Sequence, residues 1–201
     1  MDLFLTRSVP ERGAYRVHVV DESETLRGLR QLDTLVIGSI YDQYFPQIFR
    51  YVLFRVADRQ TAEDLASDVF VRLLEAARKQ RGPETNLKGW LFSTASHAVS
   101  DHHRRKYRRP VEELPDSLPD LRPGLQAEFD AREQRHNVRR AYRSLTDEQQ
   151  HVLALRFGQG YSLEETASLL GKQVNAVKAL QFRALAALQR HVGEAPDEAA
   201  A

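Results

Sequence analysis

The chain has 201 residues, of which 42% are hydrophobic, so it can bury one moderate core or two small ones. It has no cysteine, which excludes disulfides and thiolate metal sites and fits the cytoplasm. No apolar run reaches the ~18 to 20 residues of a membrane span, and residues 1–30 lack the compact apolar centre of a secretion signal. We therefore expect a soluble, cytoplasmic protein that does not insert into a membrane.

The near-neutral total charge of +1 hides three charged blocks. Residues 87–109 carry a net charge of +5, and residues 134–192 carry +5 as well. Between them, residues 110–133 carry −5. Two basic blocks around an acidic spacer favour two domains over one.

Residues 1–30 give few structural signals. Alternation from Tyr15 to Val20 is weakly typical of a strand, and Arg12-Gly13 favours a turn. We interpret this segment as an N-terminal extension of unknown conformation, an inert tail rather than a docking segment.

The first domain is predicted to contain three helices within residues 31–109. Helical spacing runs from Leu35 to Val56, with a kink or restart expected near Pro46. A second helix is predicted over residues 62–77, capped by Thr61 with Asp64, and a third begins after Asn86. The third helix ends in a run of basic residues at 104–109.

Four prolines and several acids make residues 110–128 an extended linker. The second domain, residues 129–192, is predicted to contain a long helix over 129–145, a helix over 147–157 capped by Thr146, and a pair of short helices. Residues 193–201 form a tail.

That final pair of helices, over residues 161–188, has the pattern of a helix-turn-helix. Ser162 and Glu165 form a capping box, and Gly171 ends the first helix in a left-handed conformation. An inward stripe is predicted at Val177, Leu180, Ala184, Leu185 and Leu188. The polar opposite face favours DNA binding over a pair of helices that only pack.

Three histidines, His97, His102 and His103, could suggest a metal site. Their spacing does not bring them to one helix face, and no cysteine or carboxylate pair completes a ligand set. A nucleotide-binding glycine loop is missing too, and spacing singles out no catalytic triad. We expect no metal, no cofactor and no catalytic site.

In order along the chain, Ala62–Leu74, Asn86–Leu91, Asp101–Arg105 and the helix-turn-helix resemble the extracytoplasmic-function (ECF) sigma factors of bacterial RNA polymerase. The resemblance covers about residues 35–190. It implies an all-α protein of two small helical domains joined by a flexible acidic Pro-rich linker. Region 2 would bind the clamp helices of core RNA polymerase and the −10 element, and region 4 would bind the flap and the −35 element. Many members are held inactive by an anti-sigma factor.

The resemblance also assigns roles to single residues. The polymerase-binding residues would be Asp64, Ser67, Asp68 and Arg72. The −10 element would be bound by His97, Asp101, Arg104, Arg105, Lys106 and Arg108. The −35 element would be read by Gln173, Asn175, Lys178, Ala179, Phe182 and Arg183.

This chain departs from the family pattern in places. The family usually has Asn at His97 and aliphatic residues at Ser100 and His103, and it has Ser-Arg where this chain has Ala179 and Leu180. These departures affect the −10 and −35 preference.

Other interpretations stay open from the residues alone. The chain could be a stand-alone helix-turn-helix regulator, or an enzyme acting on nucleic acid if it had a metal constellation. The acidic face over residues 63–75 could be an ordinary solvated surface, and the linker could be only a spacer, although in the family it threads the polymerase cleft. Trp90 lies on the apolar line of its helix and is expected in the core.

Overall fold

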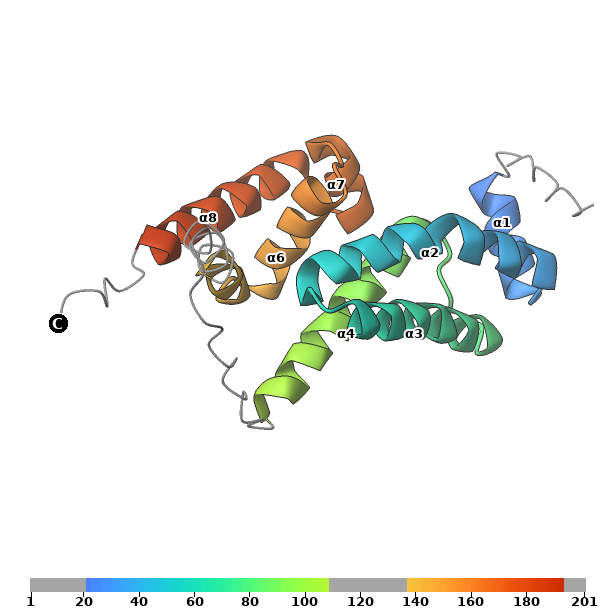
Figure 1. The fold of residues 1–201 in the computed structure, drawn as a ribbon. Coiled ribbons are helices and arrows are strands. Elements are labelled where there is room, and N and C mark those ends of the chain that lie inside the picture. The colour runs from blue at the N-terminus through green and yellow to red at the C-terminus, as the bar shows by residue number, and fades with distance from the viewer. Residues whose placement is uncertain (1–20, 109–136, 194–201) are drawn as a thin grey trace, which may run out of the picture.

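The computed structural model describes residues 21–108 and 137–193, and within these ranges it contains helices and no strand (Figure 1). The predicted all-α class is therefore confirmed. The alternation at residues 15–20, the linker at 110–128 and the tail from 194 lie outside the described residues, as does the start of the helix predicted at 129. None of the described helices is both long enough and apolar enough to cross a bilayer.

The prediction that residues 1–30 form an inert extension is wrong for residues 22–30, which form a helix. Helix α1 spans Glu22–Arg30 and begins at Asp21, whose side chain accepts a hydrogen bond from Ser23 N. Leu26 and Leu29 of α1 are buried in the core. The first domain therefore begins before residue 31 and has α1 as an additional helix.

Helix α2 spans Thr34–Val56 and passes through Pro46 as one continuous helix, so the predicted restart does not occur. Asp33 caps it by accepting from Leu35 N at 2.8 Å. Its C-terminal end is closed by Ala57, which adopts a left-handed conformation with φ of 62°.

Helices α3 and α4 complete the first half of the molecule. Helix α3 spans Arg59–Arg78, and its cap is Asp58 rather than the predicted Thr61, because Asp58 Oδ2 accepts from Thr61 N at 2.8 Å. Helix α4 spans Leu87–Arg108. The predicted cap of α4 is confirmed, since Asn86 Oδ1 accepts from Gly89 N at 2.9 Å.

The second half begins with a helical segment at residues 137–143 and continues with α6, Asp147–Leu153. The capping box that starts α6 pairs Thr146 with Gln149. A π-helical turn, η1, follows at Ala154–Gly158, and then come α7 (Leu163–Leu170) and α8 (Val174–Gly193).

The two halves share one hydrophobic core. Tyr51 and Phe92 of the first half are fully buried beside Ala154 and Leu155 of η1 in a single cluster. In Figure 1, α6 and α7 lie close to α2 and α4, and α8 lies on the outer side. The sequence predicted two domains but gave no sign of this packing.

Candidate nucleic-acid interface

The helix-turn-helix is built as predicted. Ser162 Oγ accepts from Glu165 N at 3.0 Å, and the Glu165 carboxylate accepts from Ser162 N at 2.6 Å. Gly171 ends α7 with φ of 59°, a left-handed conformation that favours glycine. These local contacts set the start of α8, the helix that a helix-turn-helix presents to the major groove.

One side of α8 is buried and the other is open to solvent. Val177 and Ala184 are fully buried, and Leu180 is nearly so. Leu185 was predicted to point inward, but it is 42% exposed, so that part of the stripe prediction is wrong. The predicted −35 residues all lie on the exposed face, namely Gln173, Asn175, Lys178, Ala179, Phe182 and Arg183.

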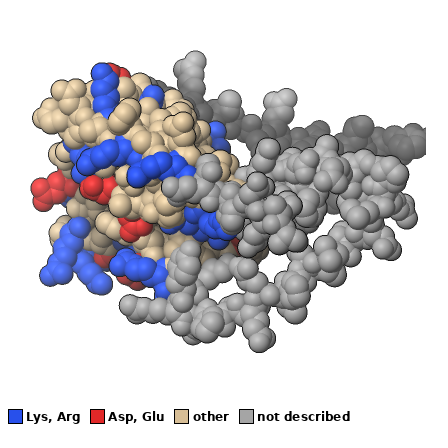
Figure 2. Space-filling view, turned by 90° about the vertical axis from the view of Figure 1, so that its left-hand side faces the viewer, with Lys and Arg blue, Asp and Glu red and all other residues tan. Residues whose placement is uncertain are grey.

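Two members of this face have properties that suit DNA contact. Phe182 is 75% exposed, which is unusual for a large apolar side chain and requires a reason. Arg183 is exposed and donates from Nε only to Ala179 O of its own helix, at 3.3 Å. Seen from the side of the molecule on which α8 lies, Lys and Arg outnumber Asp and Glu on the described surface (Figure 2).

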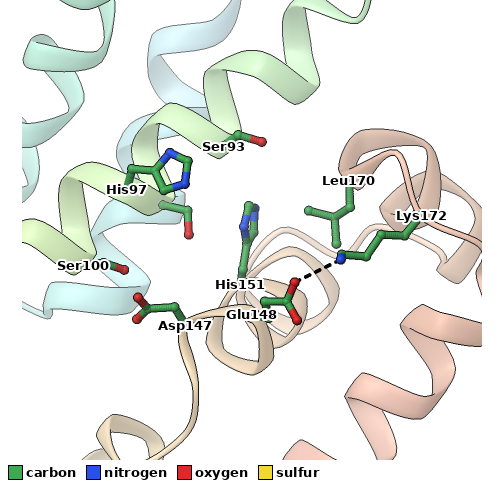
Figure 3. Close-up of a pocket in the computed structure, with 9 residues that line it drawn as sticks. Ser93, His97, Ser100, Asp147, Glu148, His151, Leu170 and Lys172 are labelled. Atoms are coloured by element: carbon green, nitrogen blue, oxygen red, sulfur yellow. Dashed lines mark hydrogen bonds and ion pairs between the residues drawn. The ribbon is translucent and has the colours of Figure 1, made fainter.

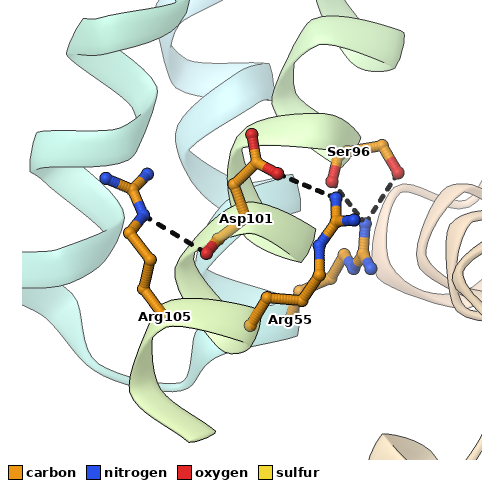
Figure 4. Close-up of polar contacts among 5 residues, drawn as sticks. Arg55, Ser96, Asp101 and Arg105 are labelled. Atoms are coloured by element: carbon orange, nitrogen blue, oxygen red, sulfur yellow. Dashed lines mark hydrogen bonds and ion pairs between the residues drawn. The ribbon is translucent and has the colours of Figure 1, made fainter. Parts of the chain in front are cut away.

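The C-terminal part of α4 carries the predicted −10 residues. Arg104 donates to the Asp101 carboxylate at 2.8 Å, and Arg105 donates from Nε to Asp101 O at 3.3 Å (Figure 4). Both arginines are exposed. The side chains of Lys106 and Arg108 lie outside the described residues. Asp101 therefore orients its basic neighbours within the helix.

His97 also lies on α4, but it faces the second half of the molecule. It lines a pocket of about 270 Å³ with Ser93 and Ser100 of the same helix. The opposite wall comes from α6 and from Lys172, which bonds the Glu148 carboxylate at 3.0 Å (Figure 3). In the described part of the chain, no group of three or more His, Cys, Asp or Glu residues is arranged to hold a metal ion.

The predicted polymerase-binding residues share one face of α3. Ser67 and Asp64 are exposed, and Asp64 accepts from Gln60 Nε2 at 3.2 Å. Asp68 and Arg72 form an ion pair at 2.8 Å, with side chains 42% and 38% exposed. The structure thus brings these four residues together on α3. The −10 residues lie together on α4, and the −35 residues lie together at the start and along the exposed face of α8.

Sequence reasoning missed the polar centre between the two halves. Arg55 of α2 is only 4% exposed. Its guanidinium donates to Tyr51 Oη at 3.0 Å, to Ser96 Oγ at 2.8 Å and to Gln150 Oε1 at 3.0 Å. Figure 4 shows the Arg55–Ser96 contact between α2 and α4. The only signal for it is an arginine at an inward position of an otherwise apolar helix.

His151 lies beside this centre on α6. Its ring centroid is 5.5 Å from that of Tyr51, and its Nε2 is buried without a hydrogen-bond partner. Burial lowers the pKa of His151 to about 3, and the Arg55 charge adds to the shift. The imidazole is therefore neutral at physiological pH in this arrangement.

Comparison with known proteins identifies the class. Residues 40–109 match the family model of sigma-70 region 2, and residues 141–190 match that of sigma-70 region 4. A solved structure of CnrH, in complex with the cytosolic domain of CnrY, has the same fold, with a TM-score of 0.57 at 19% identity over 87% of this chain and 99% of that chain. These matches define a sigma-70 type protein that has both regions.

Two relatives define the family. The ECF RNA polymerase sigma factor SigX of Bacillus subtilis is 31% identical over 159 residues, which cover 76% of this chain and 81% of SigX. The ECF RNA polymerase sigma factor BldN of Streptomyces coelicolor is 34% identical over 164 residues, which cover 81% of this chain and 61% of BldN. The chain belongs to the ECF sigma factors, and the resemblance stated from its motifs is confirmed.

Proposed function

We propose that this sigma factor binds the clamp helices and flap of core RNA polymerase, recognises −35 and −10 promoter elements and assists promoter melting. One observation carries this assignment. A single chain matches both sigma regions, and its α8 has one buried face and one exposed, basic face. A stand-alone regulator needs the second of these regions but has no use for the first. The relatives are sigma factors, and catalysis is left to the polymerase.

The α3 face is assigned to the clamp helices. Asp64, Ser67 and Asp68 offer carboxylates and a hydroxyl on an exposed helix face. Such a face suits a basic protein partner better than the phosphate backbone of DNA. Arg72 holds Asp68 in place by their ion pair.

The basic end of α4 is assigned to the opened −10 strand. Exposed arginines at 104 and 105 can neutralise phosphates of a single strand, and His97 can stack on or bond a base. Asp101 orients both arginines, which reduces the entropy lost when they bind. Lys106 and Arg108 extend the same basic run.

The exposed face of α8 is assigned to the −35 duplex. Arg183 can donate two hydrogen bonds to guanine, whereas Lys178 suits a phosphate as a point charge. Phe182 offers an apolar contact to a thymine methyl group, and Gln173 and Asn175 lie near the start of the helix, which enters the groove first.

In this proposal, region 2 comprises α1 to α4 and region 4 comprises residues 137–193, with the acidic linker between them. The partners are core polymerase and promoter DNA in the cytoplasm, together with an anti-sigma factor. CnrH, which shares the fold, was solved with a protein domain bound, and this supports the proposal of a protein inhibitor.

Run-off transcription tests the assignment. The purified chain, added to core polymerase, should give transcripts from one class of promoters and none from templates that lack it. A regulator would bind duplex DNA without the polymerase, and a nuclease would degrade the template. Absence of run-off product with core polymerase over a genomic promoter library would contradict the assignment.

A further inference from the structure

The pocket between α4 and α6 is largely separate from the residues assigned to promoter recognition. Its volume of about 270 Å³ lies just below the ~300 to 1,000 Å³ of pockets for drug-sized ligands, so it suits a small molecule. Its buried wall consists of side chains that are at most 8% exposed, namely Ser96, Ser100 and His151. Its rim consists of exposed side chains, namely His97, Asp147, Glu148 and Lys172. Of these residues, only His97 has a part in the function assigned above.

His151 presents an unused polar atom to this pocket. Its side chain is 8% exposed and points from α6 into the space between His97 of α4 and Leu170 of α7 (Figure 3). Its Nε2 is buried and has no hydrogen-bond partner. Buried polar atoms are nearly always hydrogen-bonded, because desolvation without a partner is costly. Since the imidazole is neutral, it can carry its proton on Nε2 and donate it to an acceptor in the pocket.

Ser100 adds a second polar group to the buried wall. It is 5% exposed, and its hydroxyl forms no hydrogen bond with another described residue. The family usually has an aliphatic residue at this position, and His97 on the rim is another departure from the family pattern. Both departures line one pocket, which favours a site particular to this chain.

A positive charge lies behind the buried wall. Arg55 is 4% exposed and stays protonated at physiological pH. Its acceptors among the described side chains are all neutral, namely Tyr51, Ser96 and Gln150. Its Nε is buried without a hydrogen-bond partner. A buried cation without a carboxylate partner favours an anion nearby, and Ser96 separates this cation from the pocket by a single side chain.

The rim of the pocket has the opposite charge. Asp147 is exposed and forms no ion pair with another described residue. Glu148 pairs with Lys172 at 3.0 Å, so these two charges largely cancel. The mouth of the pocket therefore keeps one uncompensated carboxylate, which favours a cationic group.

One small molecule satisfies both ends of the pocket if it carries a carboxylate and an ammonium group. A simple anion would meet a like charge at the rim, and a simple cation would meet one behind the buried wall. Leu170 adds an apolar surface that can cover an aliphatic side chain. We propose that this pocket binds a small amino acid, whose carboxylate accepts hydrogen bonds from His151 and Ser100 and whose ammonium group contacts Asp147. This site goes beyond promoter recognition, and its occupancy is measured without polymerase or DNA.

Calorimetric titration of the full chain tests the proposal with defined probes. Glycine, L-alanine and γ-aminobutyrate carry both charges at different separations, whereas acetate and ethylammonium carry one charge each. We expect saturable binding of one molecule per chain for at least one of the three zwitterions. Its affinity should exceed those of acetate and ethylammonium by about tenfold or more, because each of these lacks one charged contact.

Two variants separate the ends of the site. Asp147→Asn should weaken binding of the zwitterion by about tenfold and strengthen binding of acetate, because it removes a like charge from the rim. Glu164→Gln is the matched control, since Glu164 is also an exposed acid in the first turn of a helix that begins with a capping box, but it lies outside the pocket. Ser100→Val, which restores an aliphatic residue, should weaken the zwitterion and acetate alike.

Several outcomes overturn the proposal. If no zwitterion binds saturably at up to about 10 mM, the pocket is only a hydrated hollow. If acetate binds as tightly as the zwitterions, the site is an anion site and the role of the rim is wrong. Equal effects of Asp147→Asn and Glu164→Gln on the zwitterion would place the ligand elsewhere. Both substitutions are at exposed positions, so the comparison does not depend on changing the core.

Discussion

Region 2 and region 4 obtain their stability differently. The region 2 core is built from large side chains such as Ile48, Tyr51 and Phe92, all buried to 1% exposure or less. Region 4 has two small clusters, one around Val177 and one around Ala184, and its fully buried Leu155 belongs to the region 2 core instead. A domain with so little core of its own depends on its neighbour. We call the contacts between the two halves, with the Arg55 centre and the η1 residues in the shared core, the seam, and we expect the stability of region 4 to depend on them.

The largest expected effect comes from removing that shared leucine. Leu155→Ala should cost about 2 to 5 kcal/mol, because it leaves a cavity at a fully buried site. It should also separate the unfolding of the halves. The single tryptophan, Trp90, reports region 2 by fluorescence, and circular dichroism reports both halves. Both signals should change together in the wild type, and the ellipticity should fall first in the variant. Coincident transitions in Leu155→Ala would show that region 4 does not depend on the seam.

Breaking the polar centre should come next. Gln150→Met removes a partner of the buried Arg55 and should cost about 1 to 3 kcal/mol. Arg55→Met alone and the double variant complete a double-mutant cycle in urea. The two losses should be strongly non-additive, since each removes the same hydrogen bond. Additive losses would place Arg55 and Gln150 in separate interactions.

The α8 face should show a different kind of loss, with stability unchanged. Arg183→Ala should weaken binding to the preferred −35 site by about 1 to 3 kcal/mol and relax selection at one or two base pairs. Lys178→Ala should weaken all sequences alike and lower the salt slope by about one. Selection from a randomised −35 library measures both. Arg190→Ala is the matched control. Arg190 is also exposed on α8, and its Nε likewise donates to the carbonyl oxygen four residues earlier, Ala186 O, at 3.4 Å. If Arg183→Ala selects the same motif as the wild type, Arg183 contacts the DNA backbone and does not read a base.

Stability should fall as the pH falls. In the folded chain the pKa of His151 is lowered to about 3, against about 6.5 in the unfolded chain. The folded chain thus favours neutral His151, so this contribution to stability is complete above pH 6.5 and is lost by about 1.4 kcal/mol per unit below it. The midpoint of urea unfolding should fall between pH 7.5 and 5.5 and should recover when the pH is returned. The charged and titratable groups facing His151 are Tyr51, Arg55, His97, Asp147, Glu148 and Lys172.

Two variants separate the histidines. His151→Leu should abolish the pH response, whereas His97→Asn, which removes an exposed imidazole, should keep it. If the pH response disappears with His97→Asn and survives His151→Leu, His97 on α4 is the residue that titrates, and the assignment to His151 is wrong.

The smallest expected effect on the fold comes from the α3 face. Asp68→Lys breaks an ion pair whose members are about 40% exposed, so it should cost no more than ~1 kcal/mol of stability. Affinity for core polymerase should nevertheless fall, because the variant places a like charge against a basic surface. Glu24→Lys on α1 is the control, since it breaks the exposed pair with Arg27 and lies away from this face. Equal affinities of the two variants would remove Asp68 from the interface.

The sequence predicted what local signals determine. The Thr146 cap, the capping box at Ser162, the left-handed Gly171 and the exposed face of α8 all follow from residues a few positions apart. Helix α1 was missed because its signal is short, consisting of the Asp21 cap and two leucines. Thr61 was taken for the cap of α3 because Thr-x-x-Asp has the right spacing, whereas the helix begins earlier at Asp58.

The seam could not be predicted, because its contacts join residues far apart in the chain. Gly158 looks like an ordinary helix glycine until Phe54 is placed beside it, whereas a Cβ at Gly89 would meet both Asn86, which caps its own helix, and Leu169 O of the other half. Leu185 was predicted to be buried from periodicity alone, but it is 42% exposed. Periodicity predicts which side chains share one face of a helix. Which of them are buried depends on the neighbouring elements, and these are known only from the fold.

Hydrogen exchange of the free chain and of the chain bound to core polymerase tests the central claim most directly, namely that the α3 face binds the polymerase. The account predicts slower exchange at residues 64–72 in the bound chain and unchanged exchange on the exposed face of α8, which is assigned to DNA. Unchanged exchange at residues 64–72 in a stable complex would contradict it.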